Sequence, residues 1–252
     1  MIGADLSGRR ILVTGASSGI GLATVEIFAR NGAAVALNHL PGDARGPDEA
    51  ARLAGAGLSV VALPGDVSAP GAAEAMVAAG IERLGGLDVL VNNAGTSGTT
   101  TPIAFEDLDA MTEEFWATIL ATNLLGPFRC ARAASPTLKA SRGAIVNTAS
   151  VAGLGRRGSS VAYSASKAGL INLTRSLARA LAPDVRVNAV APGLVATPWT
   201  EPWSEERKAS TVGRTMLGRM ARPEDIAETI FFLAAGAAYI TGETITVDGG
   251  AI

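Results

Sequence analysis

The sequence predicts an α/β fold, a doubly wound sheet of seven mainly parallel strands with helices on both faces. Short β-branched runs alternate along the chain with longer, alanine-rich segments of helical pattern, as in sheets whose strands are joined by helices. Most of the expected strands are almost continuously apolar, which is typical of strands buried on both faces. The first expected strand also runs directly into a glycine-rich turn and then a helix.

The expected elements follow one another without an internal repeat. The strands are expected at residues 10–14, 34–38, 59–64, 87–91, 144–148, 186–190 and 244–247. The helices are expected at residues 20–31, 48–56, 72–83, 113–139, 162–181 and 223–235. The last helix has Pro223 in its first turn, a good helix start. Residues 41–47 and 96–102 are expected to be polar loops, and the irregular segment 194–216 a binding loop or lid.

Length and composition bound the class of protein. The 252 residues fit one large domain spanning 1–252, and 48% hydrophobic with 17% charged residues excludes a disordered chain. A net charge of −2 does not favour nucleic acid as a partner. The N-terminal segment lacks a signal-peptide pattern and no run is long enough to cross a membrane, so we expect a cytoplasmic protein. The single cysteine, Cys130, is expected to be a small buried hydrophobe.

A glycine-rich turn joins the first expected strand to the first expected helix. Its spacing is Gly-x-x-x-Gly-x-Gly, and three glycines alone do not distinguish a binding turn from a structural one. Dinucleotide binding needs such a turn, because the backbone must touch the pyrophosphate and a helix N-terminus must point at it. The position therefore predicts an NAD(P)-binding domain of Rossmann-like fold. The turn residues expected to bind the dinucleotide are Gly15, Ser17, Ser18, Gly19, Ile20 and Gly21.

A tyrosine and a lysine stand four residues apart in a segment of helical pattern. Tyr163 and Lys167 therefore share one helical face. A neighbouring ammonium lowers the pKa of a phenol, and alcohol–ketone interconversion requires an acid or base tuned toward the working pH. A lone pair with this spacing is more often a surface tyrosine and a solvated lysine. Ser150 ends the fifth expected strand, where it can donate to a substrate carbonyl or cap the next turn.

Taken together, these residues resemble the short-chain dehydrogenase/reductase family, in its compact single-domain branch with the 3-oxoacyl-ACP reductases and glucose dehydrogenases. The resemblance covers essentially the whole chain. Its motifs stand in order: the turn at 14–21, Asn-Asn-Ala-Gly at 92–95, Asn123, Ser150, Tyr163 with Lys167, Pro192-Gly193, Thr197 and the C-terminal segment 241–250.

The resemblance implies an NAD(P)-dependent oxidoreductase that interconverts a secondary alcohol and a ketone. It implies that Tyr163 gives or takes the hydroxyl proton and that Ser150 orients the carbonyl. Lys167 would hold the nicotinamide ribose and lower the pKa of Tyr163, and Asn123 would position a water for proton relay. Further cofactor contacts are implied for Asp66, Val67, Asn93, Ala94, Gly95, Val190, Pro192, Gly193, Val195 and Thr197. No metal is implied, and the family's assembly implies a homotetramer.

The residues after the second expected strand bear on the choice between NAD and NADP. NAD enzymes usually place a carboxylate there for the ribose 2′-hydroxyl, whereas this chain has Asn38, His39 and Leu40. Without a carboxylate there is no repulsion against a 2′-phosphate, which slightly favours NADP(H). Asn38 and His39 are expected at the cofactor, and His39 and Arg45 are candidate phosphate contacts that also fit a surface position.

The substrate is less clearly encoded. Trp199 and Trp203 fit either a lid over an apolar substrate or packing at a subunit boundary. Arg156 and Arg157 fit either an attraction for an anionic substrate or plain surface. The activity fits a free ketone or, alternatively, a 3-oxoacyl thioester, because pocket loops set this choice. A catalytically silent nucleotide sensor and a sugar-nucleotide epimerase are the remaining alternatives.

Overall fold

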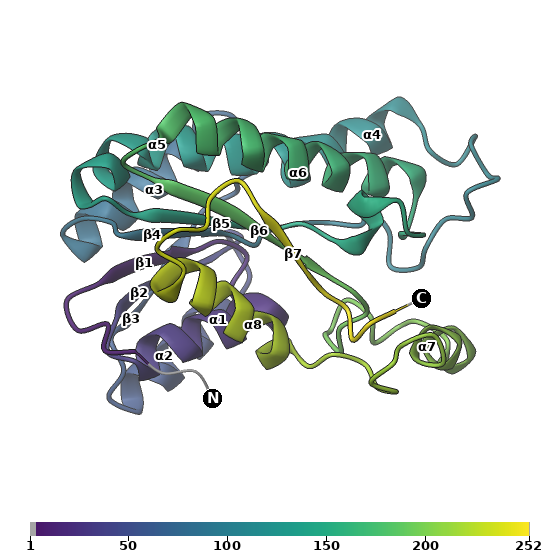
Figure 1. Ribbon diagram of the computed structural model, residues 1–252, viewed down its shortest axis with the longest axis horizontal. Coiled ribbons are helices and arrows are strands. Elements are labelled where there is room, and N and C mark those ends of the chain that lie inside the picture. Colours follow the sequence, from purple (N-terminus) through teal and green to yellow (C-terminus); the bar gives the residue numbers. More distant parts are fainter. Residues whose placement is uncertain (1–3, 252) are drawn as a thin grey trace.

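The computed structural model describes residues 4–251, and its centre is a parallel sheet of seven strands (Figure 1). The strands lie in the order β3-β2-β1-β4-β5-β6-β7, and every neighbouring pair is parallel. The expected fold class is confirmed, with shifts of one or two residues at six of the fourteen strand ends. The strands are β1 Arg10–Val13, β2 Ala34–His39, β3 Val60–Pro64, β4 Val89–Asn92, β5 Ala144–Thr148, β6 Arg186–Pro192 and β7 Thr244–Val247.

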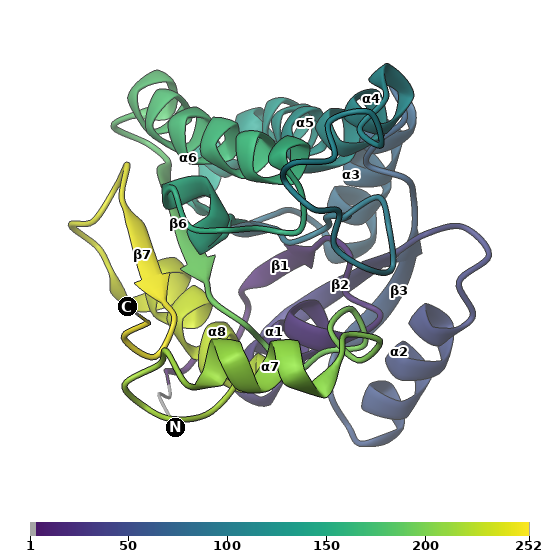
Figure 2. The same ribbon diagram turned by 90° about the vertical axis from the view of Figure 1, so that its right-hand side faces the viewer.

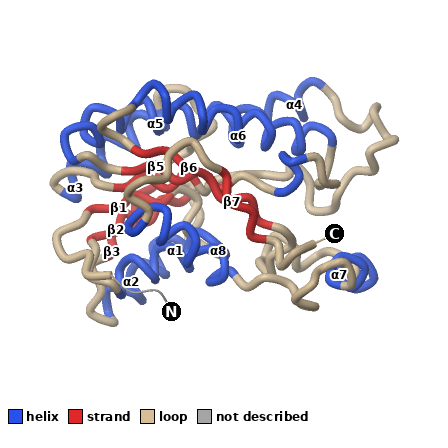
Figure 3. Tube along the Cα trace, in the orientation of Figure 1, coloured by secondary structure: helices blue, strands red, loops and turns tan. Residues whose placement is uncertain are grey.

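Helices cover both faces of the sheet (Figures 1 and 3). One face carries α1 (Gly19–Arg30), α2 (Arg45–Gly55) and α8 (Pro223–Phe231). The other carries α3 (Ala72–Leu84), α5 (Gly126–Ser141) and α6 (Val161–Leu181). Each layer has its own apolar core: the rings of Phe28 and Phe231 lie 5.3 Å apart between α1 and α8, while Leu12, Leu90 and Ile145 face the other layer. The near-continuous apolar strands are thus buried on both sides.

The strand order places a binding crevice at the carboxyl ends of the strands. The chain builds outward from β1 to β2 and β3, then returns to add β4 on the other side of β1. Ligands of such sheets bind beyond the carboxyl ends of the strands at this reversal. The carboxyl ends of the strands face the viewer in Figure 2, and α7 (Glu205–Val212) lies in front of them.

The single helix expected at 113–139 is wrong, because three segments occupy it. Helix α4 (Glu113–Leu120) passes into a π-helical turn, Ala121–Leu125, before α5 begins. Pro127 has no N–H to donate to the Asn123 carbonyl, as a regular helix would require. The turn is therefore wide at Asn123, and wide turns of this kind are frequent at functional sites.

Three further expectations about helices need correction. The segment 194–216 is not irregular throughout, since it contains α7, which begins where Ser204 Oγ accepts from the Arg207 N–H at 3.3 Å. None of its residues is buried, so it lacks the apolar stripe that marks a helix in sequence. Helix α2 begins at Arg45 and not at 48, and α8 gives way to a π-helical turn, Phe232–Gly236.

Two smaller expectations concern membranes and the cysteine. Within residues 4–251, no helix has the length and apolar character needed to cross a membrane. Cys130 lies fully buried in α5, and burial raises the pKa of its thiol to about 12. The thiol therefore stays protonated, so its expected role as a buried hydrophobe is confirmed.

Candidate active site

A cleft of about 1310 Å³ opens beyond the carboxyl ends of the strands. It exceeds the usual volume of a single small-ligand pocket, roughly 300–1,000 Å³, and so has room for a dinucleotide and a small substrate together. All but three of the predicted site residues line it: Gly15, Ser17, Ser18, Gly19, Ile20, Asn38, His39, Asp66, Val67, Asn93, Ala94, Gly95, Ser150, Tyr163, Lys167, Pro192, Gly193, Val195 and Thr197. The exceptions are Gly21, Asn123 and Val190, of which Gly21 approaches Asn93 and Asn123 approaches Gly95 in the cleft lining.

The glycine-rich turn leaves a helix N-terminus open toward the cleft. Ser18 is the N-cap residue of α1, but its side chain makes no capping hydrogen bond. The first backbone N–H groups of α1 are thus available to an anion, and the helix dipole favours negative charge there. Thr197 faces the turn from the opposite side, since a Cβ on Gly19 would lie 3.1 Å from its Cγ2. The turn therefore fits the pyrophosphate of a dinucleotide.

Residue 21 must be glycine because neighbouring atoms of the turn and of Asn93 leave no room for a Cβ. A Cβ there would lie 2.6 Å from Asn93 Nδ2 and would also meet the Gly15 carbonyl oxygen. The Asn93 amide in turn donates to the Thr14 and Gly15 carbonyls at 3.1 and 2.9 Å. The Asn93 side chain therefore holds the turn in shape.

Replacing Gly21 with alanine is expected to weaken NADPH binding by about 10-fold, because relieving the overlap shifts the turn at a cost of 1–3 kcal/mol. Titration followed by nucleotide fluorescence measures the change. Gly55→Ala is the matched control, since a Cβ there meets nothing within 4 Å. Equal NADPH affinity for Gly21→Ala and wild type would show that the turn does not contact the nucleotide.

The residues after β2 have structural partners of their own. Asn38 Oδ1 accepts from the Gly15 N–H at 3.1 Å, and its amide donates to the carbonyls of Leu63 and Gly65. The ring of His39 is buried, with Nδ1 3.0 Å from the Leu40 carbonyl. Both residues line the cleft, where the polar atoms of the Asn38 side chain are already bound to the protein backbone.

An acidic residue at this end of the cleft was missed by the sequence analysis. Asp43 lies beyond β2 and accepts from Ser17 Oγ at 2.8 Å. Arg45 makes a two-pronged ion pair with the same carboxylate, with both N–O distances 2.9 Å. The guanidinium holds the pKa of Asp43 far below its usual range. Asp43 sits too far beyond the strand to match the usual acidic position, so only the folded loop shows that it faces the turn.

Tyr163 and Ser150 come together at the other end of the cleft. Ser160 caps α6 by accepting from the Tyr163 N–H at 3.0 Å, which fixes the tyrosine in the first turn. Burial raises the pKa of Tyr163 to about 12, and a hydrogen bond with the Ser150 side chain acts in the opposite direction. Ser150 Oγ also accepts from the Ala152 N–H at 3.2 Å. Ser150 therefore caps a turn, as one of the two alternatives predicts, and its hydroxyl still has a proton to donate.

Lys167 shares the site with Tyr163, as their spacing predicts. Its Nζ lies 5.7 Å from the centre of the Tyr163 ring and donates to the Thr148 carbonyl at 2.8 Å. The side chain is 3% exposed, and burial lowers the pKa of its ammonium to about 8. In the protein alone, burial of the phenol dominates, so the pKa of Tyr163 lies above its usual value and not below it as expected.

Asn123 supports this end of the cleft from the π-helical turn. Its amide oxygen accepts from the Thr96 N–H at 2.8 Å, and its nitrogen donates to the Thr96 carbonyl and to Ser166 Oγ. A Cβ on Gly95 would lie 3.3 Å from Asn123 Oδ1 and 3.5 Å from Lys167 Nζ. Asn123 and Lys167 thus border the same space, and this space stays open because residue 95 is a glycine without a side chain.

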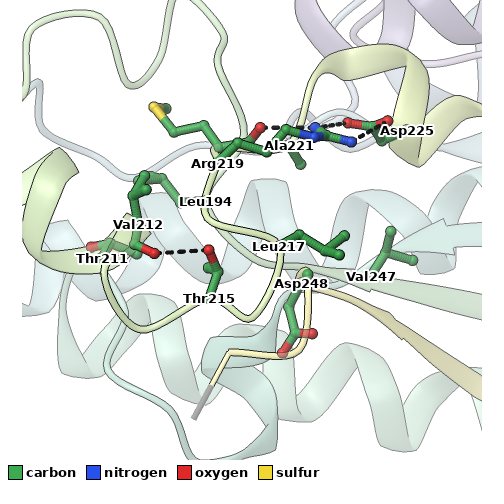
Figure 4. Close-up of a pocket in the computed structure, with 12 residues that line it drawn as sticks. Leu194, Thr211, Val212, Thr215, Leu217, Arg219, Ala221, Asp225, Val247 and Asp248 are labelled. Atoms are coloured by element: carbon green, nitrogen blue, oxygen red, sulfur yellow. Dashed lines mark hydrogen bonds and ion pairs between the residues drawn. The ribbon is translucent and has the colours of Figure 1, made fainter.

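The segment after β6 covers the substrate end. The Trp199 ring meets the Tyr163 ring edge-on at 5.9 Å, and Trp203 also lines the cleft. A second cavity of about 150 Å³ lies behind α7 and shares Leu194, Thr211, Thr215 and Asp248 with the cleft (Figure 4). Residues of α7 therefore line both the cleft and the second cavity. Substitutions in this helix are expected to change ligand binding more than folding.

A dinucleotide turn at one end and a serine, a tyrosine and a buried lysine at the other define a class of protein, the NAD(P)-dependent oxidoreductases acting on CH–OH and keto groups. Comparison with known proteins bears this out. The family model described as enoyl-(acyl carrier protein) reductase matches residues 15–251. The chain belongs to the short-chain dehydrogenase/reductase family.

Individual relatives cover nearly the whole chain. A 3-oxoacyl-(acyl-carrier-protein) reductase of Thermotoga maritima is 37% identical over 98% of this chain and 99% of its own. A cis-4-hydroxycyclohexanecarboxylate dehydrogenase of Sinomonas cyclohexanicum is 39% identical over 99% and 98%. The solved structure of a short-chain dehydrogenase/reductase of the glucose/ribitol dehydrogenase type from Brucella melitensis is 34% identical, with a TM-score of 0.89 over 99% and 98%.

Proposed function

We propose that the chain, as a single NAD(P)-binding domain spanning 1–252, interconverts a secondary alcohol and a ketone with Tyr163 as general acid and base. The observation that carries this proposal is the meeting of Ser150, Tyr163 and Lys167 in a cleft that also holds a dinucleotide turn. A bound nicotinamide supplies or accepts the hydride. The residues of the chain orient the substrate and transfer the proton.

The proton path begins at the Tyr163 hydroxyl. In the reductive direction it donates its proton to the carbonyl oxygen, and the Ser150 hydroxyl donates a second hydrogen bond to the same oxygen. The Lys167 ammonium, which donates to the Thr148 carbonyl, stabilises the phenolate that remains. Asn123 and Gly95 border the space beside Lys167, which is where a proton would return from solvent.

The substrate is a ketone, either free or carried as a 3-oxoacyl thioester. The Thermotoga relative is named for a 3-oxoacyl carrier substrate and the Sinomonas relative for a cyclic hydroxy acid. The test is a panel followed by the absorbance of reduced nicotinamide: cyclohexanone, 4-oxocyclohexanecarboxylate and an acetoacetyl thioester. Turnover of one or more supports the proposal. Tight nucleotide binding with no turnover of any ketone would favour a silent sensor.

NADP(H) is the proposed cofactor, and Arg45 is the residue on which this depends. Its guanidinium lies in the cleft wall and offsets the charge of Asp43, so a 2′-phosphate meets no net repulsion. Arg45→Ala should lower the affinity for NADPH relative to NADH by about 10-fold, because it removes a charge-assisted contact and leaves Asp43 unpaired. Arg52→Ala, on the same helix but outside the cleft, is the control. An unchanged preference would remove Arg45 from this role.

We also propose a homotetramer in the cytoplasm. Exposed apolar side chains support the assembly: Leu125 and Phe128 lie at the start of α5, and Phe232 and Tyr239 lie near the C-terminal segment. Light scattering tests it, and a monomeric mass would contradict it. A buried, unpaired Cys130 fits a reducing compartment, which cell fractionation can check.

A further inference from the structure

Five arginines line the catalytic cleft, and the structure separates them by their partners. Arg45 pairs with Asp43 at the nucleotide end, and the others are Arg156, Arg157, Arg207 and Arg214. Arg156 pairs with the Asp248 carboxylate at 2.7 Å, and that carboxylate is buried. Its charge is therefore already balanced, so it is the weaker of the two arginines that the sequence suggested for an anionic substrate.

Arg157 and Arg207 approach each other from two different elements. Arg157 lies in the loop between β5 and α6, and Arg207 lies on α7. Burial is the main cause that lowers the pKa of Arg207, and the nearby charge of Arg157 lowers it further. Each guanidinium lies over an aromatic ring, Arg157 over Phe105 at 5.4 Å and Arg207 over Trp203 at 4.8 Å. The rings hold both groups in place without neutralising their charge.

Carboxylates do not balance this pair. Within residues 4–251, Arg207 has no carboxylate oxygen within 4 Å. Arg157 has Glu106 at 3.8 Å, but both side chains are largely exposed, and such contacts contribute little. Glu206, beside Arg207 on α7, also lines the cleft but forms no ion pair with a described cation. Two like charges held together in this way favour an oxyanion that can bind both.

The pair lies next to the reacting centre. Gly158 follows Arg157 directly, and a Cβ on it would lie 3.2 Å from Tyr163 Cδ1. On the other side, Trp199 packs against the Tyr163 ring, and Trp203 carries Arg207 over its face. Arg157 and Arg207 therefore line the same cleft as Tyr163, and Arg157 is next in sequence to a residue that borders the Tyr163 ring.

We propose that the substrate is an oxo acid whose carboxylate is bound by Arg157 and Arg207 together. This inference rests on the proposed function, because it specifies the substrate of the same site. A phosphate on an acyl carrier would offer the same oxyanion chemistry. The position of Arg157 beside Gly158, which borders the Tyr163 ring, favours a carboxylate on the substrate itself, since a carrier phosphate lies many bonds from the thioester carbonyl.

The kinetic test compares 4-oxocyclohexanecarboxylate with its methyl ester, which has the same ring but no charge. Wild type should prefer the acid by about 10-fold or more in kcat/KM, mainly through KM. Arg157→Gln and Arg207→Gln should each remove most of that preference and change kcat/KM for the ester less than about 2-fold. Lys208→Gln is the control, because Lys208 lies on α7 but pairs with Glu205 outside the cleft.

Two outcomes would overturn the inference. One is equal kcat/KM for acid and ester in wild type, or a parallel loss of both in the arginine variants. The other is an arginine dependence seen with acetoacetyl-CoA but not with the oxo acid or the N-acetylcysteamine thioester, which would assign the pair to a carrier phosphate.

A binding measurement separates this inference from the proposed activity. Cyclohexanecarboxylate, which cannot react, is titrated into the protein saturated with oxidised nucleotide, and tryptophan fluorescence reports on Trp199 and Trp203. Binding to wild type that weakens about 10-fold in Arg157→Gln and Arg207→Gln supports the site even if no ketone is turned over. Equal affinity in all three proteins contradicts the site, whatever the outcome of the turnover assays.

Discussion

Tyr163→Phe is expected to lower kcat for ketone reduction by roughly 10²–10⁴-fold, the usual contribution of a positioned general acid. The phenylalanine keeps the ring that packs edge-on against Trp199 and removes only the hydroxyl that bonds with Ser150. Folding and nucleotide affinity should therefore stay within about 2-fold of wild type, because the proton donor is lost while the cleft keeps its shape. Steady-state kinetics and NADPH titration measure the two quantities separately.

The chain provides its own control for this variant. It has two tyrosines, and the other, Tyr239, is fully exposed near the C-terminal end. Tyr239→Phe should retain wild-type kcat and KM. A Tyr163→Phe enzyme that kept more than about a tenth of wild-type kcat would show that another group delivers the proton, since loss of a general acid costs at least ~100-fold.

The fold could be predicted because it depends on patterns that are local in sequence. Buried parallel strands appear as short apolar runs, and the turn before α1 is marked by its glycines. Tyr163 and Lys167 could be paired for the same reason, since the spacing on one helix fixes their relation. The predicted strands and the shared position of this pair therefore agree with the structure.

What could not be predicted depends on contacts between distant segments. The π-helical turn at Asn123 follows from Pro127 together with a side chain that binds the Thr96 backbone. Helix α7 has no buried face that a sequence pattern could reveal. Arg157 and Arg207 line one cleft because a loop and helix α7, far apart in sequence, both border it.

The pKa of Tyr163 illustrates the same limit. Spacing shows that a cation is near the phenol, but it does not show how deeply the phenol is buried. In the folded chain, burial dominates and raises the pKa of Tyr163, while Lys167 directs its ammonium to the Thr148 carbonyl. Electrostatic effects of this kind depend on local solvation more than on the identity of the neighbours.

Lys167→Met is expected to abolish most activity and yet stabilise the protein near neutral pH. Activity should fall by ~100-fold or more, because the phenolate left by proton transfer loses its neighbouring cation. Stability should rise because the ammonium is buried: its pKa falls from 10.5 to about 8 on folding. Below about pH 8 the folded protein holds a charge that unfolding would return to water, so the charged lysine destabilises the fold.

The pH dependence distinguishes this cause from any general effect of the substitution. As the pH rises from about 8 toward 10.5, the unfolded lysine still binds a proton that the folded one has released, so wild-type stability recovers. Lys167→Met should therefore raise Tm by roughly 2–5 °C near neutral pH, after allowance for the lost bond to Thr148, and the gain should shrink as the pH rises. Thermal unfolding across this range measures it, with exposed Lys139→Met as control. A Tm that falls at neutral pH would mean that the hydrogen bond to the Thr148 carbonyl outweighs the cost of burying the charge.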